Sequence, residues 1–158
     1  MQPPQRAIPK RILGVDYGLT RIGLALSDER QVIAMPLNVL LADKRTERTV
    51  ANLLVVIDEL SQKYQSEIVE IVIGLPLMMS GQTGFLADEV KHFVQLLSQS
   101  CSIPIKTWDE RLSTVQAERS LREGSLSRKK RSKLVDTVSA TIILQNYLDS
   151  KSLMTPNQ

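Results

Sequence analysis

The sequence predicts a single α/β domain built on a mixed β-sheet with helices packed against it. Three apolar runs come first, separated by breaks too short to contain crossover helices, so their strands pair antiparallel. Later apolar runs alternate with segments of helical periodicity, which favours parallel strands joined by helices. Together these patterns predict a five-stranded sheet, three antiparallel strands followed by two parallel strands, flanked by helices.

The first three predicted strands span residues 11–17, 21–27 and 31–40. Each is an apolar run, and only short polar or glycine-containing breaks separate one run from the next. A doubly wound parallel sheet is the main alternative fold, but these breaks leave no room for the crossover helices that it requires. We therefore expect an antiparallel meander at the start of the sheet.

A helix and a buried strand follow the meander. Asp43 is available to cap the helix, whose apolar residues recur at helical spacing: Val50, Leu53, Leu54, Ile57 and Leu60. The next run, residues 68–75, is nearly continuous and rich in β-branched residues, as expected for a central parallel strand covered on both faces. Glu70 in this strand is expected to face solvent.

A second helix and a fifth strand come next. The spacing of apolar residues over 86–97 predicts the helix, which Thr83 could cap, and residues 103–108 predict the strand. His92 is expected to be structural or at the surface, because it has no evident partner. Trp108 is expected to pack at the end of its strand, with stacking on a nucleic-acid base as the alternative.

Two more helices are expected in the C-terminal part of the chain. Ser113 followed by Gln116 is a capping-box pattern and Gly124 is a suitable stop, so a third helix is predicted between them. A basic connector follows. The last helix is predicted from Leu134 to Leu148, where apolar residues again recur at helical spacing.

Length and composition also indicate one globular domain. The chain has 158 residues, of which 42% are hydrophobic and 23% are charged. We expect a flexible tail over residues 1–10, a single domain over 11–150 and a polar tail over 151–158. No apolar stretch approaches the roughly 18 residues that span a bilayer, and no secretory signal is evident, so we expect a cytoplasmic protein without a membrane partner. The net charge of +3 weakly favours a polyanionic partner.

Several chemically capable segments are expected at one edge of the sheet. If the first, fourth and fifth strands run parallel, their carboxyl ends share an edge, which is where ligands usually bind in such sheets. That edge would gather Asp16, Gly74-Leu75-Pro76, Asp109-Glu110-Arg111 and, at the start of the last helix, Asp136. Three glycines are expected to be turn residues around this edge: Gly18, Gly23 and Gly74.

Each acidic residue also has a purely structural interpretation. Asp at a turn often makes local hydrogen bonds, and an acidic residue near a helix N-terminus is favourable by itself. Taken together, however, carboxylates without Cys or His ligands suit Mg²⁺ or Mn²⁺ rather than zinc. Two such ions about 4 Å apart can activate a water and stabilise the leaving oxygen of a phosphodiester. This arrangement indicates nuclease chemistry.

A basic segment directly precedes Asp136. Residues 127–133 carry five cations, which could hold a phosphate backbone beside the metal: Arg128, Lys129, Lys130, Arg131 and Lys133. A run of charge is usually only a solvated face. Its position next to the acidic set is what favours a nucleic-acid interface.

The motifs in combination resemble the YqgF/RuvX family over roughly residues 11–149. They are Asp16-x-Gly18-x-x-Arg21-Ile22-Gly23, Gly74-Leu75-Pro76-Leu77, Asp109-Glu110-Arg111-Leu112-Ser113-Thr114, and Lys133 with Asp136. The family is described as Holliday junction resolvases and, more recently, as nucleases that mature the 5′ end of pre-16S ribosomal RNA. The resemblance implies an RNase H-like fold with a metal-dependent site.

The resemblance also assigns roles to residues. It implies that Asp16, Glu110 and Asp136 form the catalytic, metal-binding set, with Asp109 in reserve. Arg21 and Arg111 would then hold phosphate or position the carboxylates, although either could instead form a structural ion pair. One loop departs from the family pattern: residues 78–81 read Met-Met-Ser-Gly, where the family often has an asparagine and an aspartate before the glycine. This difference puts in doubt any contact that the loop makes in the family.

The expected function is therefore a metal-dependent endonuclease, with Mg²⁺ or Mn²⁺ as cofactor. RNA is the favoured substrate on the family resemblance, and branched DNA is the alternative. Junction resolution needs two coordinated cuts and hence usually a homodimer. A non-catalytic nucleic-acid-binding or ribosome-binding protein is a second class, and a nucleotide-hydrolysing relative of the actin and Hsp70 ATPases is a third. The third is disfavoured because the chain lacks room for a two-lobed nucleotide cleft and has no Walker A sequence.

Overall fold

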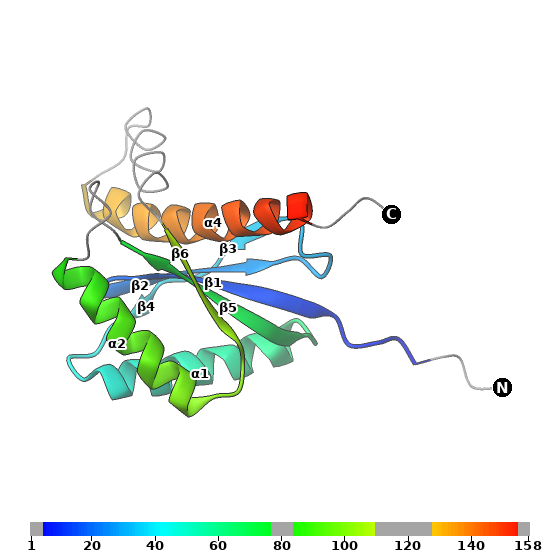
Figure 1. The fold of residues 1–158 in the computed structure, drawn as a ribbon, viewed down its shortest axis with the longest axis horizontal. Helices are drawn as coiled ribbons and strands as arrows, with labels where there is room; N and C mark the ends of the chain where they lie inside the picture. The colour runs from blue at the N-terminus through cyan, green and yellow to red at the C-terminus, as the bar shows by residue number, and fades with distance from the viewer. Residues whose placement is uncertain (1–4, 77–83, 110–127, 155–158) are drawn as a thin grey trace.

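The computed structural model describes residues 5–76, 84–109 and 128–154, of which 128–137, 153 and 154 are described by their backbone alone (Figure 1). The elements are β1 Lys10–Tyr17, β2 Arg21–Ser27, β3 Ala34–Pro36, β4 Leu40–Leu41, α1 Thr46–Lys63, β5 Glu67–Leu75, α2 Phe85–Ser100, β6 Ile105–Asp109 and α4 Arg128–Met154. The strands form one sheet in the order β3-β2-β1-β5-β6, and β4 also pairs with β2.

The strand directions confirm the predicted mixed α/β sheet. β1 is antiparallel to β2 and parallel to β5, and β5 is parallel to β6. α1 and α2 cover one face of this sheet and α4 covers the other (Figure 1). β1 and β5 are central strands with side chains buried on both faces, which explains why their sequences are almost continuously apolar.

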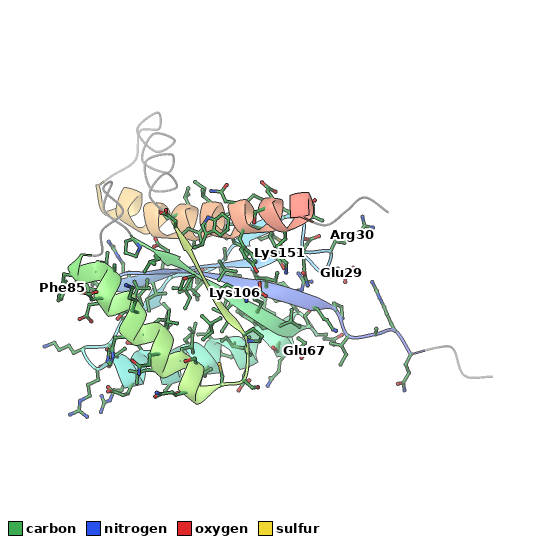
Figure 2. All side chains as sticks on the ribbon, viewed as in Figure 1. Glu29, Arg30, Glu67, Phe85, Lys106 and Lys151 are labelled. Carbon is green, nitrogen blue, oxygen red and sulfur yellow. The ribbon has the colours of Figure 1, made fainter. Side chains whose placement is uncertain are left out.

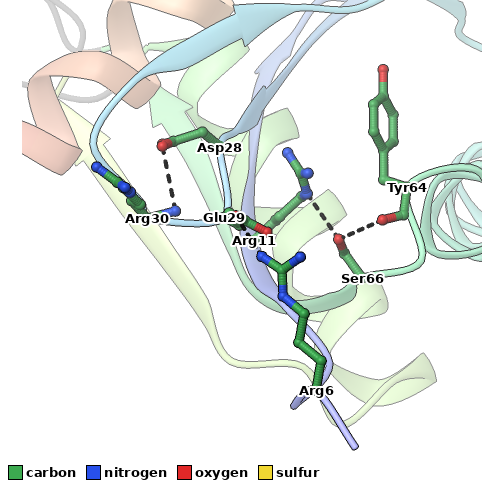
Figure 3. A network of polar contacts seen from close by, with 7 residues as sticks. All are labelled: Arg6, Arg11, Asp28, Glu29, Arg30, Tyr64 and Ser66. Carbon is green, nitrogen blue, oxygen red and sulfur yellow. Dashed lines mark hydrogen bonds and ion pairs between the residues drawn. The ribbon is translucent and has the colours of Figure 1, made fainter. Parts of the chain in front are cut away.

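The sheet has six strands rather than five, because the predicted third strand is divided into β3 and β4. A turn occupies its first part, since the carboxylate of Asp28 accepts hydrogen bonds from the backbone N–H groups of Arg30, Val32 and Ile33. Figure 3 shows the bond from Arg30. These bonds hold the pKa of Asp28 below its usual value, although partial burial acts in the opposite direction. Pro36, which has no N–H to donate, then ends β3.

Helices α1 and α2 begin after residues other than the predicted capping residues. The N-cap of α1 is Arg45 rather than Asp43, whose carboxylate instead accepts a hydrogen bond from the Arg45 backbone N–H at 2.9 Å. The N-cap of α2 is Gly84 rather than Thr83. Thr83 and the helix predicted between residues 113 and 124 lie outside the described residues.

The basic segment is helical and is not the predicted connector. α4 begins at Arg128 rather than near Leu134, and it continues to Met154, into the predicted polar tail. Asp136 therefore lies within the helix and not at its start. The residues of α4 include neither proline nor glycine, and Lys and Arg favour helices, so nothing in this stretch interrupts the helix.

Candidate active site

The carboxyl ends of β1, β5 and β6 meet at one edge of the sheet, as predicted. Val15 of β1 pairs with Ile73 of β5, and further along β5 Leu75 pairs with Asp109, so the three strands end at similar levels. α4 starts above this edge and runs back across the sheet, opposite in direction to β1 (Figure 1). The edge therefore brings together strand ends and a helix start that are far apart in sequence.

Asp16 lies on the face of the sheet that α4 covers. Leu13, Val15 and Tyr17 pack in the hydrophobic cluster with α1 and α2, whereas Ile12 packs in the cluster with α4. Because side chains alternate along a strand, the even-numbered residues of β1 face α4. The partly buried carboxylate of Asp16 therefore points to the α4 side.

Glycines flank Asp16 on both neighbouring strands. Gly23 of β2 is its direct antiparallel partner, and Gly74 of β5 follows Ile73, the partner of Val15. Gly74 in turn pairs with Trp108 of β6. Across four neighbouring strands, the residues on the α4 face at this level are therefore Gly23, Asp16, Gly74 and Trp108. Because both neighbours of Asp16 are glycines, no side chain of β2 or β5 lies directly beside its carboxylate.

Two of the three glycines predicted to be turn residues lie elsewhere. Gly23 and Gly74 lie inside β2 and β5 rather than in turns. Gly18 does belong to the β1–β2 hairpin, where an added Cβ would collide with the backbone carbonyl of Arg21. Gly14 allows α4 to lie close to β1, since a Cβ there would be 2.8 Å from the Cβ of Leu144.

Arg21 shares the α4 face with Asp16. It lies two residues before Gly23 in β2, so it is the diagonal neighbour of Asp16 across the antiparallel pair. Diagonal side chains of this kind are about 7–8 Å apart, within reach of a long side chain. A guanidinium here can contact a phosphate held beside Asp16 or orient the carboxylate itself.

Asp109 lies on the opposite face from Asp16. Ile105, four residues earlier in β6, packs in the cluster with α1 and α2. Because side chains alternate along a strand, Asp109 lies on that same side. Trp108 faces α4 and packs edge-to-face on Tyr147, with 5.7 Å between ring centroids. The expectation that Trp108 packs at the strand end is confirmed.

Extrapolation along α4 indicates which part of the helix lies at the level of Asp16. A Cβ added at Gly14 would lie 2.8 Å from the Cβ of Leu144 and 3.2 Å from the carbonyl oxygen of Ala140. Asp16 is two residues, or about 6.6 Å, further along β1. One turn back along the antiparallel helix, about 6 Å, is residue 136. The first turns of α4, which hold the basic residues, extend beyond that point.

Several predicted site residues fall where no side chain is described. Glu110, Arg111 and the loop at 78–81 lie outside the described residues, and the side chains of Asp136 and the basic set do as well. Among the side chains that are described, no group of three Asp, Glu, His or Cys residues could hold a metal ion. The described part of the chain contributes Asp16 and Arg21 to the α4 face of this edge.

A polar network that the sequence did not predict fastens α4 to β5. Glu70 does not face solvent: its side chain is 15% exposed, it accepts a hydrogen bond from the Tyr147 hydroxyl, and Lys151 Nζ lies 3.8 Å from its carboxylate. Burial and then the Glu70 carboxylate raise the pKa of Tyr147 well above its usual value. Nothing in the local sequence pairs Glu70 with residues of the last helix. His92, by contrast, is exposed on α2, which is the surface alternative of the two predicted for it.

The comparison with protein families decides which group this architecture represents. A model of the RuvX family, described as Holliday junction resolvase, matches residues 10–150. The chain belongs to the RuvX family. This result confirms the resemblance predicted from the four motifs, and it makes the chain a member of a nuclease family whose matched region contains every candidate site residue.

Relatives and solved structures agree with this membership. A protein of Protochlamydia amoebophila, provisionally named pre-16S rRNA nuclease, is 67% identical over 143 residues, covering 90% of this chain and 95% of that protein. A protein of Halothermothrix orenii with the same name is 45% identical over 139 residues, covering 88% and 94%. RuvC of Thermus thermophilus, solved with a Holliday junction substrate, has a TM-score of 0.53 at 12% identity, covering 92% of this chain and 98% of RuvC. This last likeness shows the RNase H-like fold.

None of the helices in residues 5–76, 84–109 and 128–154 combines the length and apolar character that a membrane span requires.

Proposed function

We propose that this RuvX-family protein is a metal-dependent endonuclease that hydrolyses RNA phosphodiesters and processes the 5′ end of pre-16S ribosomal RNA. The observation that carries the proposal is the setting of Asp16. Its carboxylate faces α4 at the carboxyl edge of the sheet, between two glycines. The 67% identity to a provisionally named pre-16S rRNA nuclease supports ribosomal RNA as the substrate. A cytoplasmic location is part of this proposal.

The proposed metal ligands and catalytic residues are Asp16, Glu110 and Asp136. Asp109, the reserve candidate, is the less suitable partner because it lies on the face of the sheet opposite Asp16. Residue 136 is favoured by its place on α4, one helical turn before Ala140, whose carbonyl oxygen lies close to Gly14.

The chemistry of this donor set fits Mg²⁺ or Mn²⁺. Carboxylate oxygens are the ligands that these hard cations prefer, and the glycines beside Asp16 leave the adjacent sheet surface without side chains. Such ions, when bound, activate water for attack on phosphorus and stabilise the leaving oxygen. The donor set therefore favours Mg²⁺ or Mn²⁺ over zinc.

The remaining roles in the proposal belong to cations of the chain. Arg21, diagonal to Asp16 on the same face, binds a phosphate oxygen near the scissile bond or positions the Asp16 carboxylate. Arg111 is proposed to act in the same way. The first turns of α4 hold the phosphate backbone on either side of the cut through Arg128, Lys129, Lys130, Arg131 and Lys133.

Cleavage of two labelled substrates in parallel tests the proposal. One is the 5′ region of pre-16S rRNA and the other is a four-way DNA junction, each with Mg²⁺ or Mn²⁺. We expect wild type to cut the RNA and Asp16→Asn to lose at least about a hundredfold in rate, since the carboxylate charge that holds metal is removed. Asp28→Asn is the matched control, because Asp28 is a partly buried aspartate at the opposite end of β2 and should leave the rate unchanged.

Two outcomes would count against the proposal. Cleavage that survives both Asp16→Asn and a chelator would contradict the metal mechanism. Salt-sensitive binding without any cutting would instead favour the non-catalytic binding protein.

The second candidate function is Holliday junction resolution, which the description of the matching family favours. It uses the same site, but two coordinated cuts require two copies of that site, usually in a symmetric dimer. Preferential cutting of the junction by a dimeric protein would establish this function, and a strictly monomeric protein would exclude it.

A further inference from the structure

Among the contacts of the described residues, Phe85 is the one aromatic side chain with neither a ring partner nor a cation over its ring. All six aromatic residues lie within the described residues, and four of them pair ring to ring, Tyr17 with Phe93 at 4.6 Å and Trp108 with Tyr147 at 5.7 Å between centroids. The guanidinium of Arg11 lies 5.0 Å from the ring centroid of Tyr64. Phe85, at the first position of α2, is 69% exposed (Figure 2).

Phe85 lies at the same end of the molecule as the candidate active site. α2 begins at the edge where β1 and β5 end (Figure 1). Tyr17, the residue after Asp16, packs on Phe93, which is buried in the middle of α2. Phe85 is eight residues earlier, so it projects about 12 Å beyond that contact along the helix axis. α2 packs on the face of the sheet opposite α4, so a strand whose phosphate lies beside Asp16 would reach Phe85 by passing around the carboxyl edge of the sheet.

The charges around Phe85 select the part of a nucleotide that can bind there. Asp88 is exposed in the first turn of α2, and Glu89 follows it. These carboxylates repel phosphate, so the sugar–phosphate backbone is not the group that Phe85 contacts. The face of a base carries no net charge and stacks on aromatic rings. In a duplex that face is covered by neighbouring base pairs, whereas unpaired bases are free to stack.

We infer that Phe85 stacks on an unpaired base of the substrate strand, close to the cleavage site, so that the protein selects single-stranded nucleic acid. The inference deepens and rests on the proposed nuclease function. It favours a flexible RNA end over a four-way junction, whose arms are fully paired.

Binding measurements without cleavage test this inference. The probes are a short single-stranded oligoribonucleotide and a blunt duplex of the same sequence, with the full chain in chelator so that nothing is cut. Phe85→Ala and Phe85→Leu should each bind the single strand roughly five- to hundredfold more weakly, the effect of losing one stacked base. Phe85→Tyr, which keeps the ring, should bind like wild type. Val55→Ala is the matched control, since Val55 is 55% exposed on α1.

The salt dependence of binding gives a second readout. Stacking releases no counterions, so the slope of log Kd against log salt should be the same for Phe85→Ala as for wild type. An oligonucleotide with a single abasic position should also bind wild type more weakly, but should cost the Phe85→Ala variant nothing further at the stacking position.

Three results would overturn the inference. They are unchanged single-strand affinity in Phe85→Ala, an equal loss for single strand and duplex, and full retention of affinity by Phe85→Leu. Because no cutting is measured, failure here is separate from failure of the nuclease proposal, which the Asp16→Asn cleavage assay decides.

Discussion

At the scale of single residues, the glycines around Asp16 are as informative as the carboxylate. Gly23 and Gly74 lie beside it on the α4 face, while Gly14, two residues earlier in β1, lies where an added Cβ would be 2.8 Å from the Cβ of Leu144. Glycine in a strand interior normally weakens the sheet, and it often marks a site where a ligand or another backbone approaches closely. Gly14 is explained by the approach of α4, and in the proposed function Gly23 and Gly74 leave space for a ligand at Asp16.

The two kinds of glycine should respond differently to alanine. Gly74→Ala places a methyl group beside Asp16 and should lower the cleavage rate by about ten- to hundredfold, since small displacements of reacting groups have effects of this size. Its thermal midpoint should not fall, because alanine relieves the entropic cost of glycine. Gly14→Ala should instead lower the thermal midpoint, because its Cβ would lie 2.8 Å from Leu144.

Thermal unfolding and cleavage rate, measured on both variants, check this division of roles. If Gly74→Ala cleaves at the wild-type rate, the surface beside Asp16 does not hold a ligand.

At the scale of secondary-structure elements, the placement of α4 is decisive. The helix carries both Asp136 and the basic segment, and among its described side chains the buried ones that pack on the sheet include Ala140, Ile143, Leu144 and Leu148. The network of Glu70, Tyr147 and Lys151 fixes the C-terminal half of α4 to β5. Since a helix is stiff, anchoring this half sets where the N-terminal half lies above Asp16.

Removing the Tyr147 hydroxyl tests this anchor. Tyr147→Phe removes the hydroxyl that donates to Glu70 and leaves only Lys151 beside that carboxylate, so it should lower the free energy of unfolding at pH 7 by about 1 kcal/mol, a discounted value for a partly exposed pair. The pKa of Tyr147 is raised in the folded protein, so its contribution is fully present below about pH 10, the unfolded value, and is lost as pH rises further.

Urea unfolding at pH 7 and at strongly alkaline pH measures both effects. The difference between wild type and Tyr147→Phe should shrink at alkaline pH. Tyr64→Phe is the control, because Tyr64 contacts Arg11 through its ring. Equal stability of wild type and Tyr147→Phe at pH 7 would show that the network does not anchor α4.

At the scale of the whole molecule, charge is distributed unevenly. The net charge is only +3, yet five cations lie within residues 128–133 at the start of α4. α4 begins above the edge that contains Asp16, so this positive region lies at the same end of the molecule as the candidate site (Figure 1). A nucleic acid attracted to this end would be directed to the site before any specific contact forms.

Neutralising the basic segment should reduce the salt dependence of binding. We expect replacement of Arg128, Lys129, Lys130, Arg131 and Lys133 by Gln to flatten the slope of log Kd against log salt by about 0.7 for each phosphate of a single strand that the variant no longer neutralises. Fluorescence anisotropy over a salt series measures the slope. An unchanged slope would mean that the segment is a solvated face. Circular dichroism checks that the helix is retained, as expected because Gln also favours helices.

The sequence by itself determined the mixed sheet, the strand directions and the edge at which Asp16 lies. It could do so because apolar periodicity and the length of connections are local properties that constrain strand pairing directly. The motifs likewise sufficed for family membership, and the shape of the carboxyl edge followed from the parallel pairing of β1, β5 and β6.

Only the tertiary structure decided which face each residue occupies and what lies beside it. That Asp109 points away from Asp16, that Gly23 and Gly74 flank the carboxylate and that Glu70 is paired with Tyr147 all depend on register between strands and on packing against α4. These relations join residues far apart in the chain, and a shift of one residue in register would reverse every face. Local sequence therefore contains no signal for them, and packing of the complete sheet and helices sets them.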